Sequence, residues 1–149
     1  MEFGVSRLQP VECARSRSLA DAGRSPSFWD RARKRARSAL KQSESARLPE
    51  IMPVMDLESW IGSGTLGDRP GIVLDRDARP LARVLDGWTG SPSLVLLVGP
   101  EGGLTEDELR ASVAAGFQPA WLAWTILHLE TAATAALAIA TQQIGDAAS

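Results

Sequence analysis

The segment of residues 94–109 constrains the fold of this chain more than any other stretch. It opens with five consecutive apolar residues, which is typical of a central parallel strand that is covered on both faces. Three glycines among residues 99–103 (Gly-Pro-Glu-Gly-Gly) then allow a tight turn. Thr105, followed three residues later by Glu108, has the pattern of a capping box at the start of a helix. The segment therefore predicts a buried strand, a glycine-rich turn and a helix.

A turn of this kind is where open α/β sheets bind ligands. The first turn of the predicted helix carries Glu106, Asp107 and Glu108, whose negative charges would repel a phosphate. Residues 99–105 match neither the Walker A loop nor the dinucleotide fingerprint. Two interpretations remain open from this segment alone. Either backbone groups of the turn hold a ligand without phosphates, or the turn is a tight connection with no ligand.

A second motif follows a short apolar segment at residues 120–124 and reads Ile126-Leu127-x-x-Glu130-Thr131-Ala132. In order and approximate spacing, this motif and residues 99–103 resemble those of the RsmE-type methyltransferases, which modify N3 of a uridine in 16S ribosomal RNA. Residues 2–5, 15–16 and 42–51 resemble further segments of the same family. The resemblance covers nearly all of the 149 residues.

The resemblance implies an α/β fold of the SPOUT superfamily, with a parallel sheet, helices on both faces and a C-terminal trefoil knot. Deep knots are very rare, so the knot rests on the resemblance alone. Family members begin with a β-barrel RNA-binding domain and the first strand and helix of the methyltransferase domain. We therefore expect residues 1–149 to form a SPOUT-like domain that lacks the barrel, that strand and that helix, and to be less stable in isolation. A truncated gene or an incorrect start would account for the same pattern.

The ligand that the resemblance implies is S-adenosylmethionine, which carries a sulfonium cation and no phosphate and so suits an acidic turn. In such proteins the backbone groups of three loops bind it. Carried over to this chain, the cofactor-binding residues are Leu74, Val98, Gly99, Pro100, Glu101, Gly102, Gly103, Leu122, Ala123, Ile126 and Leu127. Ala123 stands where the family usually has glycine, and Trp124 and Thr125 are further departures.

Methyl transfer to a uridine N3 requires near-attack geometry and help in removing the N3 proton. The catalytic candidates are Glu101, His128 and Glu130. His128 stands where the family has an arginine, and it is shorter and mostly neutral at pH 7. A charge that could stabilise a uridine oxyanion is therefore weakened. Glu130 either orients catalytic groups or caps and packs the final helix.

The charge distribution is compatible with an RNA partner. Residues 1–50 hold 11 lysines and arginines against 6 acidic residues, whereas residues 51–149 hold 5 against 12. Many of these cations fall in a predicted helix at residues 29–42, and charge alone favours a solvated helix face over an RNA contact. The resemblance implies that Arg15, Gln42, Ser43 and Arg47 lie toward 16S ribosomal RNA or the small ribosomal subunit. Gln42 and Ser43 could also simply end the helix.

Composition excludes several other classes of protein. One cysteine cannot form an intramolecular disulfide and favours a reducing cytoplasm, and one histidine argues against a zinc site, so we expect no metal. No apolar run approaches a membrane span, so we expect no membrane partner. The alanine-rich final helix, predicted at residues 131–144 and ended by Gly145, is either a homodimer interface or an ordinary amphipathic helix. The alternative to an active methyltransferase is a non-catalytic SPOUT-like remnant or RNA-binding dimer.

The remaining elements follow from apolar patterns and breakers. On the helix after Thr105, we expect Leu109, Val113 and Phe117 on one face and Gly116 as the C-terminal cap. The other predicted elements are a strand at residues 5–11, a short helix at 57–61, a strand at 71–74, a charged loop at 75–80, one or two helical turns at 81–85 and a last strand at 119–123.

Overall fold

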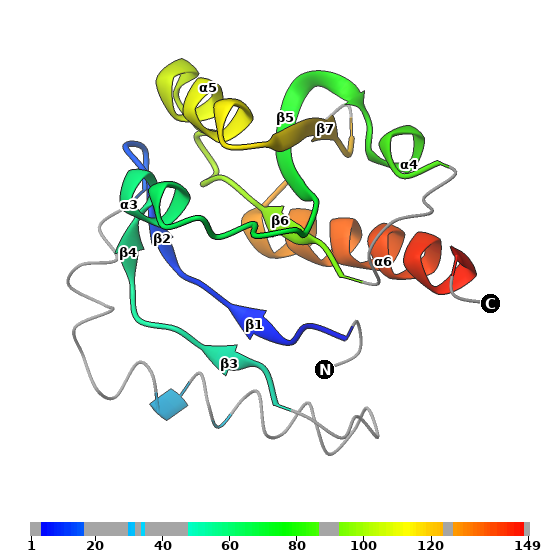
Figure 1. The fold of residues 1–149 in the computed structure, drawn as a ribbon, viewed down its shortest axis with the longest axis horizontal. Coiled ribbons are helices and arrows are strands. Elements are labelled where there is room, and N and C mark those ends of the chain that lie inside the picture. Colours follow the sequence, from blue (N-terminus) through cyan, green and yellow to red (C-terminus); the bar gives the residue numbers. More distant parts are fainter. Residues whose placement is uncertain are drawn as a thin grey trace. The chain divides into compact units, whose positions relative to one another are not determined.

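The computed structural model of the chain describes residues 4–16, 30–31, 34, 48–86, 93–123 and 127–147 (Figure 1). The chain divides into two compact units, one made of Met1–Glu12 and Ser16–Asp56, and the other of Cys13–Arg15 and Leu57–Ser149. Asp30, Arg31 and Lys34 are helical, and the rest of the helix predicted at residues 29–42 lies outside the described residues.

The first unit contains two short parallel strand pairs. β1 (Arg7–Leu8) pairs with β3 (Glu50–Ile51), and β2 (Val11–Glu12) pairs with β4 (Met55–Asp56). The prediction of one continuous strand at residues 5–11 is wrong, because the strand is interrupted at Gln9 and Pro10. Pro10 has no N–H to donate to a neighbouring strand. At this interruption the side-chain amide of Gln9 donates to the carbonyls of Pro10 and Pro53, at 3.0 and 2.6 Å.

The second unit is built on a three-stranded parallel sheet with the order β6-β5-β7. β5 (Gly71–Pro80) lies between β6 (Val95–Leu97) and β7 (Phe117–Trp121). α4 (Leu81–Val84) follows β5, and α5 (Glu106–Ala114) connects β6 to β7. A parallel sheet needs such crossovers, because the chain must return to the same end of the sheet before each strand.

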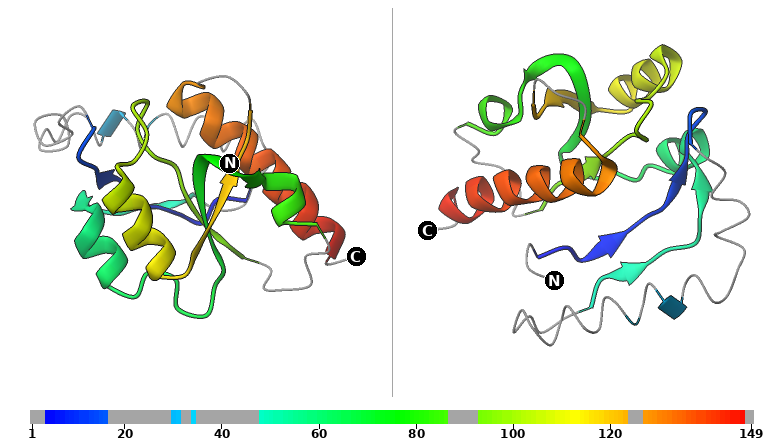
Figure 2. Two further views of the ribbon diagram at one scale, coloured as in Figure 1. Left: turned by 90° about the horizontal axis from the view of Figure 1, so that it is seen from above. Right: turned by 180° about the vertical axis from the view of Figure 1, so that it is seen from behind.

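One face of this sheet packs against α4 and α6 (Leu129–Ala147) (Figure 2). Side chains alternate along a strand, so Ile72 and Leu74 of β5 point to this face. Small residues of α6 allow it to approach closely. The buried residues of this core are Ile72, Leu81, Leu85, Ala120, Ala136 and Ala140.

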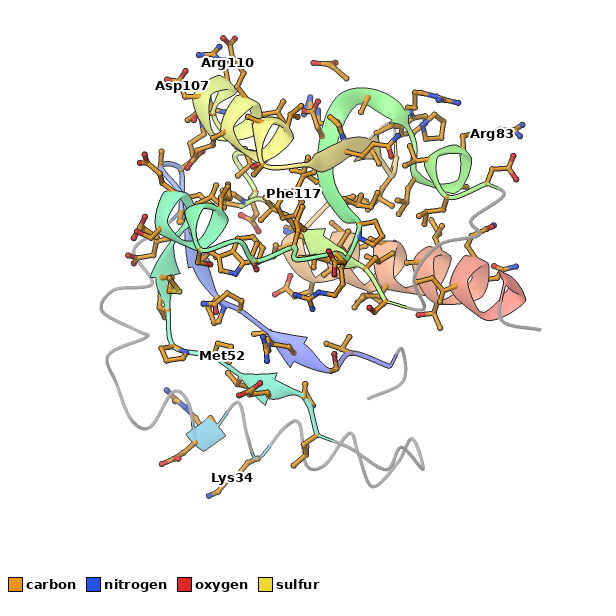
Figure 3. All side chains as sticks on the ribbon, in the orientation of Figure 1. Lys34, Met52, Arg83, Asp107, Arg110 and Phe117 are labelled. Carbon is orange, nitrogen blue, oxygen red and sulfur yellow. The ribbon has the colours of Figure 1, made fainter. Side chains whose placement is uncertain are left out.

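The opposite face packs against α3 (Leu57–Gly62) and α5. Val73 and Leu97, the strand neighbours of the residues on the first face, are buried here. Phe117 points inward beneath α5, and its ring lies 5.9 Å from that of Trp60 (Figure 3). The prediction of a parallel sheet with helices on both faces is therefore confirmed for this unit.

β5 extends further than the sequence predicts. The predicted strand at residues 71–74 is present, but Arg79 and Pro80, which we expected in a loop, return to the ladder. The register shifts between Leu74 and Arg79, and both are aligned with Ala120. Residues 75–78 therefore protrude from the pairing between β5 and β7, but they belong to β5, so the prediction of a loop at residues 75–80 is wrong.

The predicted capping box of α5 is present in full. The Thr105 hydroxyl accepts from the Glu108 N–H at 3.2 Å, and Glu108 Oε2 accepts from the Thr105 N–H at 2.7 Å. The helix ends next to Gly116, whose φ of 100° confirms the predicted cap. The predicted apolar face is wrong in two members: Phe117 begins β7, and Val113 is exposed.

The boundaries of two C-terminal elements also differ from prediction. β7 starts two residues before the predicted strand at 119–123, because Phe117 is buried in the sheet. α6 starts at Leu129 rather than residue 131 and continues through Gly145, which does not end it. None of the helices in the described segments combines the length and apolarity needed to cross a membrane.

Candidate functional site

The carboxyl ends of the three parallel strands meet at one edge of the sheet. Leu74 marks the point where β5 leaves the regular ladder, Val98 follows β6, and Leu122 and Ala123 follow β7. The chain leaves β5 toward α4 on one face and leaves β6 toward α5 on the other. Such a divergence between neighbouring strands is where α/β sheets bind ligands. Leu74, Val98, Leu122 and Ala123, four of the predicted cofactor-binding residues, therefore lie along this edge.

The turn at residues 99–103 depends on its glycines in two ways. Gly103 has a φ of 70°, which side-chain-bearing residues rarely adopt, and its N–H bonds to the Pro100 carbonyl at 2.8 Å. A Cβ at Gly99 would lie 3.1 Å from Cγ of Leu104 and 3.3 Å from its backbone nitrogen. Gly102 and Gly103 are exposed, whereas Val98 to Pro100 are half-buried. The second half of the turn is thus exposed backbone, and the residues that lead into it are half-buried.

Arg15 reaches this turn from a distant part of the sequence. Its Nη1 donates to the carbonyl of Gly102 at 3.0 Å and to that of Leu104 at 3.2 Å. The sequence predicted only a role toward RNA for this residue. Because its partners lie 87 and 89 residues away, nothing in the local sequence around Arg15 signals the contact.

Glu108 connects the same distant segment to the start of α5. Besides its bond to the Thr105 N–H, its Oε1 accepts from the Ala14 N–H at 2.6 Å. Partial burial raises the pKa of Glu108, but the hydrogen bonds from Thr105 and Ala14 and the charge of Arg15 outweigh this effect, so the pKa lies below its usual value of 4.5. Glu108 is therefore held as a carboxylate.

Two of the three predicted catalytic residues are in contact. His128 Nδ1 lies 3.1 Å from Oε1 of Glu101, and the side chains are 82% and 62% exposed. The hydrogen bond with Glu101 and then its charge raise the pKa of His128 above 6.5, and the charge of Glu130 adds to this. The pair joins the glycine-rich turn to the start of α6.

Glu130 lies in the first turn of α6 with an exposed side chain. The exposed position argues against a packing role within this unit, and the catalytic and capping roles stay predictions. Its charge is favourable near a helix N-terminus. Leu127 is half-buried just ahead of the helix. Ile126, Gln42, Ser43 and Arg47, together with Trp124 and Thr125, lie outside the described residues.

Comparison with known proteins agrees with this arrangement. The sequence pattern of the RNA methyltransferase domain family matches residues 1–141. The chain belongs to this RNA methyltransferase family. Among the curated relatives of this chain is ribosomal RNA small subunit methyltransferase E of Mycobacterium bovis, which is 33% identical over 140 residues, covering 91% of the chain and 53% of the relative. The enzyme of the same name from Synechocystis is 30% identical over 142 residues, covering 92% and 45%.

The chain therefore spans about half the length of the curated relatives it matches. A solved ribosomal RNA small subunit methyltransferase E from Neisseria gonorrhoeae, bound to S-adenosyl methionine, superposes with a TM-score of 0.77 at 30% identity, covering 95% of the chain and 56% of that protein. A Legionella pneumophila protein solved with the same cofactor has a TM-score of 0.80 at 23% identity, covering 97% and 57%, and supports the fold alone. The resemblance seen in the sequence is thus confirmed.

Proposed function

We propose that this chain carries the cofactor-binding and catalytic part of an S-adenosylmethionine-dependent methyltransferase that acts on N3 of a uridine in 16S ribosomal RNA. The contact between Glu101 and His128 carries the proposal, because it joins two motifs 27 residues apart at the edge where the sheet's carboxyl ends meet. The cofactor bound to the Neisseria gonorrhoeae relative supports the choice of ligand.

The residues at this edge fit such a cofactor. Gly102 and Gly103 are exposed and carry no side chains, so a ligand can approach the backbone there, although the Gly103 N–H and the Gly102 carbonyl already bond to Pro100 and Arg15. The half-buried apolar side chains of Leu74, Val98 and Leu122 could pack against the adenine ring of the cofactor. Acidic groups at Glu101 and at the start of α5 favour a cation and disfavour phosphate. The apolar and backbone groups that would hold the cofactor are Leu74, Val98, Gly99, Pro100, Gly102, Gly103, Leu122, Ala123, Ile126 and Leu127.

When bound, S-adenosylmethionine supplies an electrophilic methyl carbon attached to a sulfonium. The contribution of the chain's own residues is to orient the base and remove the N3 proton, because the neutral imide nitrogen is a poor nucleophile. A carboxylate only accepts hydrogen bonds, so in the Glu101–His128 pair the imidazole Nδ1 carries the hydrogen. In the neutral ring, Nε2 is then left as an acceptor.

His128 Nε2 is therefore our candidate for the general base that takes the N3 proton. The product of that step is an imidazolium, which Glu101 stabilises directly and Glu130 stabilises through its charge. Glu101 orients the ring and raises its basicity, which makes it a positioning residue. Compared with an arginine at the same position, a histidine can both accept a proton and, once charged, stabilise a developing uridine oxyanion.

Family membership supports several finer proposals. We propose that residues 1–149 belong to one SPOUT-like methyltransferase domain whose C-terminal part, including α6, forms a trefoil knot. We also propose that the protein works in the cytoplasm as a homodimer, with small residues of α6 at its interface. Gln42, Ser43 and Arg47 are the proposed RNA contacts from the basic part of the sequence.

The test is transfer of a labelled methyl group from S-adenosylmethionine to 16S ribosomal RNA or small ribosomal subunits. After digestion to nucleosides, we expect the label in 3-methyluridine. His128→Gln should lower kcat by about 100-fold or more, which is the usual contribution of a general base. Thr134→Ala, an exposed change on the same helix, should have no effect. Label at another atom, or no transfer by a chain that binds the cofactor, would contradict the proposed reaction.

A further inference from the structure

Two side chains outside the glycine-rich turn, those of Arg15 and Glu108, hold it in place through hydrogen bonds. The two carbonyls that accept from Arg15 belong to Gly102 and Leu104, on either side of Gly103. The aliphatic stem of Arg15 also lies against the turn, since a Cβ at Gly102 would be 3.4 Å from Cβ of Arg15 and 3.5 Å from its Cδ. Arg15 therefore fixes the backbone on both sides of Gly103, the residue of the turn with a left-handed conformation and no side chain of its own.

Glu108 holds the other end of the turn. Each of its oxygens accepts from a different backbone N–H, one on Ala14 and one on Thr105, which are far apart in sequence. Hydrogen bonds to a charged acceptor are the stronger kind. Arg15 and Glu108 also attract each other, as the effect of Arg15 on the pKa of Glu108 shows. Three hydrogen bonds therefore join residues 14 and 15 to Gly102, Leu104 and Glu108, and a fourth joins Glu108 to the Thr105 N–H.

We propose that Arg15 and Glu108 are positioning residues that hold the glycine-rich turn in the conformation that receives the cofactor. This inference rests on the proposed function and extends it, because it gives Arg15 a role at the cofactor site in place of one toward RNA. A ligand binds with an apparent affinity reduced by the fraction of the protein in the competent conformation. Loosening the turn therefore weakens cofactor binding without touching the reacting groups.

The variants that test this are Arg15→Gln, Arg15→Lys and Glu108→Gln. Lysine keeps the charge but cannot reproduce the fork of a guanidinium, so it should rescue only in part. Arg110→Gln is the matched control, because Arg110 lies on α5 but is exposed and pairs with Asp107 on the outer side of the helix (Figure 3). Two readouts are needed: amide hydrogen exchange of residues 99–105 without cofactor, and binding and kinetics with S-adenosylmethionine.

We expect Arg15→Gln and Glu108→Gln to speed exchange in the turn and to raise the KM for the cofactor by about tenfold or more, since a lost hydrogen bond to a charged group shifts an equilibrium by that order. The kcat at saturating cofactor should stay near wild type, and Arg110→Gln should change neither quantity. If Arg15→Gln does not fold, Arg15→Lys and Glu108→Gln carry the test.

The inference would be overturned if these variants had the same exchange rates and the same KM for the cofactor as the wild type and lost only affinity for RNA. The exchange readout also separates it from the proposed function. If the wild-type chain binds no S-adenosylmethionine, the proposed function fails, whereas faster exchange in the variants would still support the positioning role and unchanged exchange would refute it.

Discussion

Thr105 offers a sharp test of how α5 and the turn before it are stabilised. Its hydroxyl accepts the Glu108 N–H at 3.2 Å, while its own N–H is bonded to the Glu108 carboxylate. Thr105→Ala removes the first bond and keeps the second. Loss of an N-cap side chain costs about 1 kcal/mol. With a urea m value of about 2 kcal/mol/M, the unfolding midpoint should fall by about 0.5 M.

The assay is urea unfolding followed by circular dichroism, with two matched controls. Thr105→Ser keeps an N-cap acceptor and should lie close to wild type. Thr134→Ala also removes a threonine hydroxyl from a helix, but there the hydroxyl donates to the Glu130 carbonyl within α6 and caps nothing. Alanine has the higher helix propensity, so this control should be neutral or slightly stabilising. Equal midpoints for Thr105→Ala and Thr134→Ala would refute the capping argument.

Three further predictions follow from the site and the core. Glu101→Gln removes the charge that raises the pKa of His128, so the rising limb of kcat/KM against pH should move toward lower pH; an unmoved limb would exclude His128 as the base. Because the folded pKa of Glu108 is lowered, its contribution to stability is present above pH 4.5 and is lost as pH falls through the folded pKa. Urea midpoints of wild type should therefore fall more steeply below pH 4.5 than those of Glu108→Gln, and parallel curves would contradict this. Phe117→Ala should destabilise by about 3–5 kcal/mol, and Phe117→Leu by less, in the same unfolding assay, because the ring is 2% exposed against Trp60; a loss under about 1 kcal/mol would contradict its place in the core.

Features of the fold that depend on local sequence could be predicted. The capping box at Thr105 and Glu108 and the positive φ at Gly116 involve residues within one helical turn, so sequence spacing suffices. The end of α6 could not be predicted in the same way. Gly145 is a poor helix residue, yet helix propensity is weak beside tertiary packing, and Ala136 and Ala140 bury this helix against the sheet.

In the candidate site, too, the features set by local sequence could be predicted, and those set by tertiary contacts could not. The two motifs identified the turn and the residues around Glu130, and their resemblance to a known family implied that they share a site. The contact of Glu101 with His128 depends on how two loops meet, which periodicity does not encode. The bonds of Arg15 to Gly102 and Leu104 and of Ala14 to Glu108 span 87 to 94 residues, and only the fold brings these residues together. The protrusion at residues 75–78 likewise depends on pairing with β7.

The central claim is that the turn at residues 99–103 binds S-adenosylmethionine, and calorimetric titration of the purified chain tests it most directly. Gly103→Val should be compared with Gly64→Val, because both glycines have a φ of 70° and open space where a Cβ would lie, but Gly64 lies in the turn after α3. Valine is equally strained at both positions. We predict that wild type and Gly64→Val bind with similar Kd values and that Gly103→Val binds at least about tenfold more weakly. A folded wild-type chain that binds no cofactor, or equal Kd values for the two variants, would contradict the account.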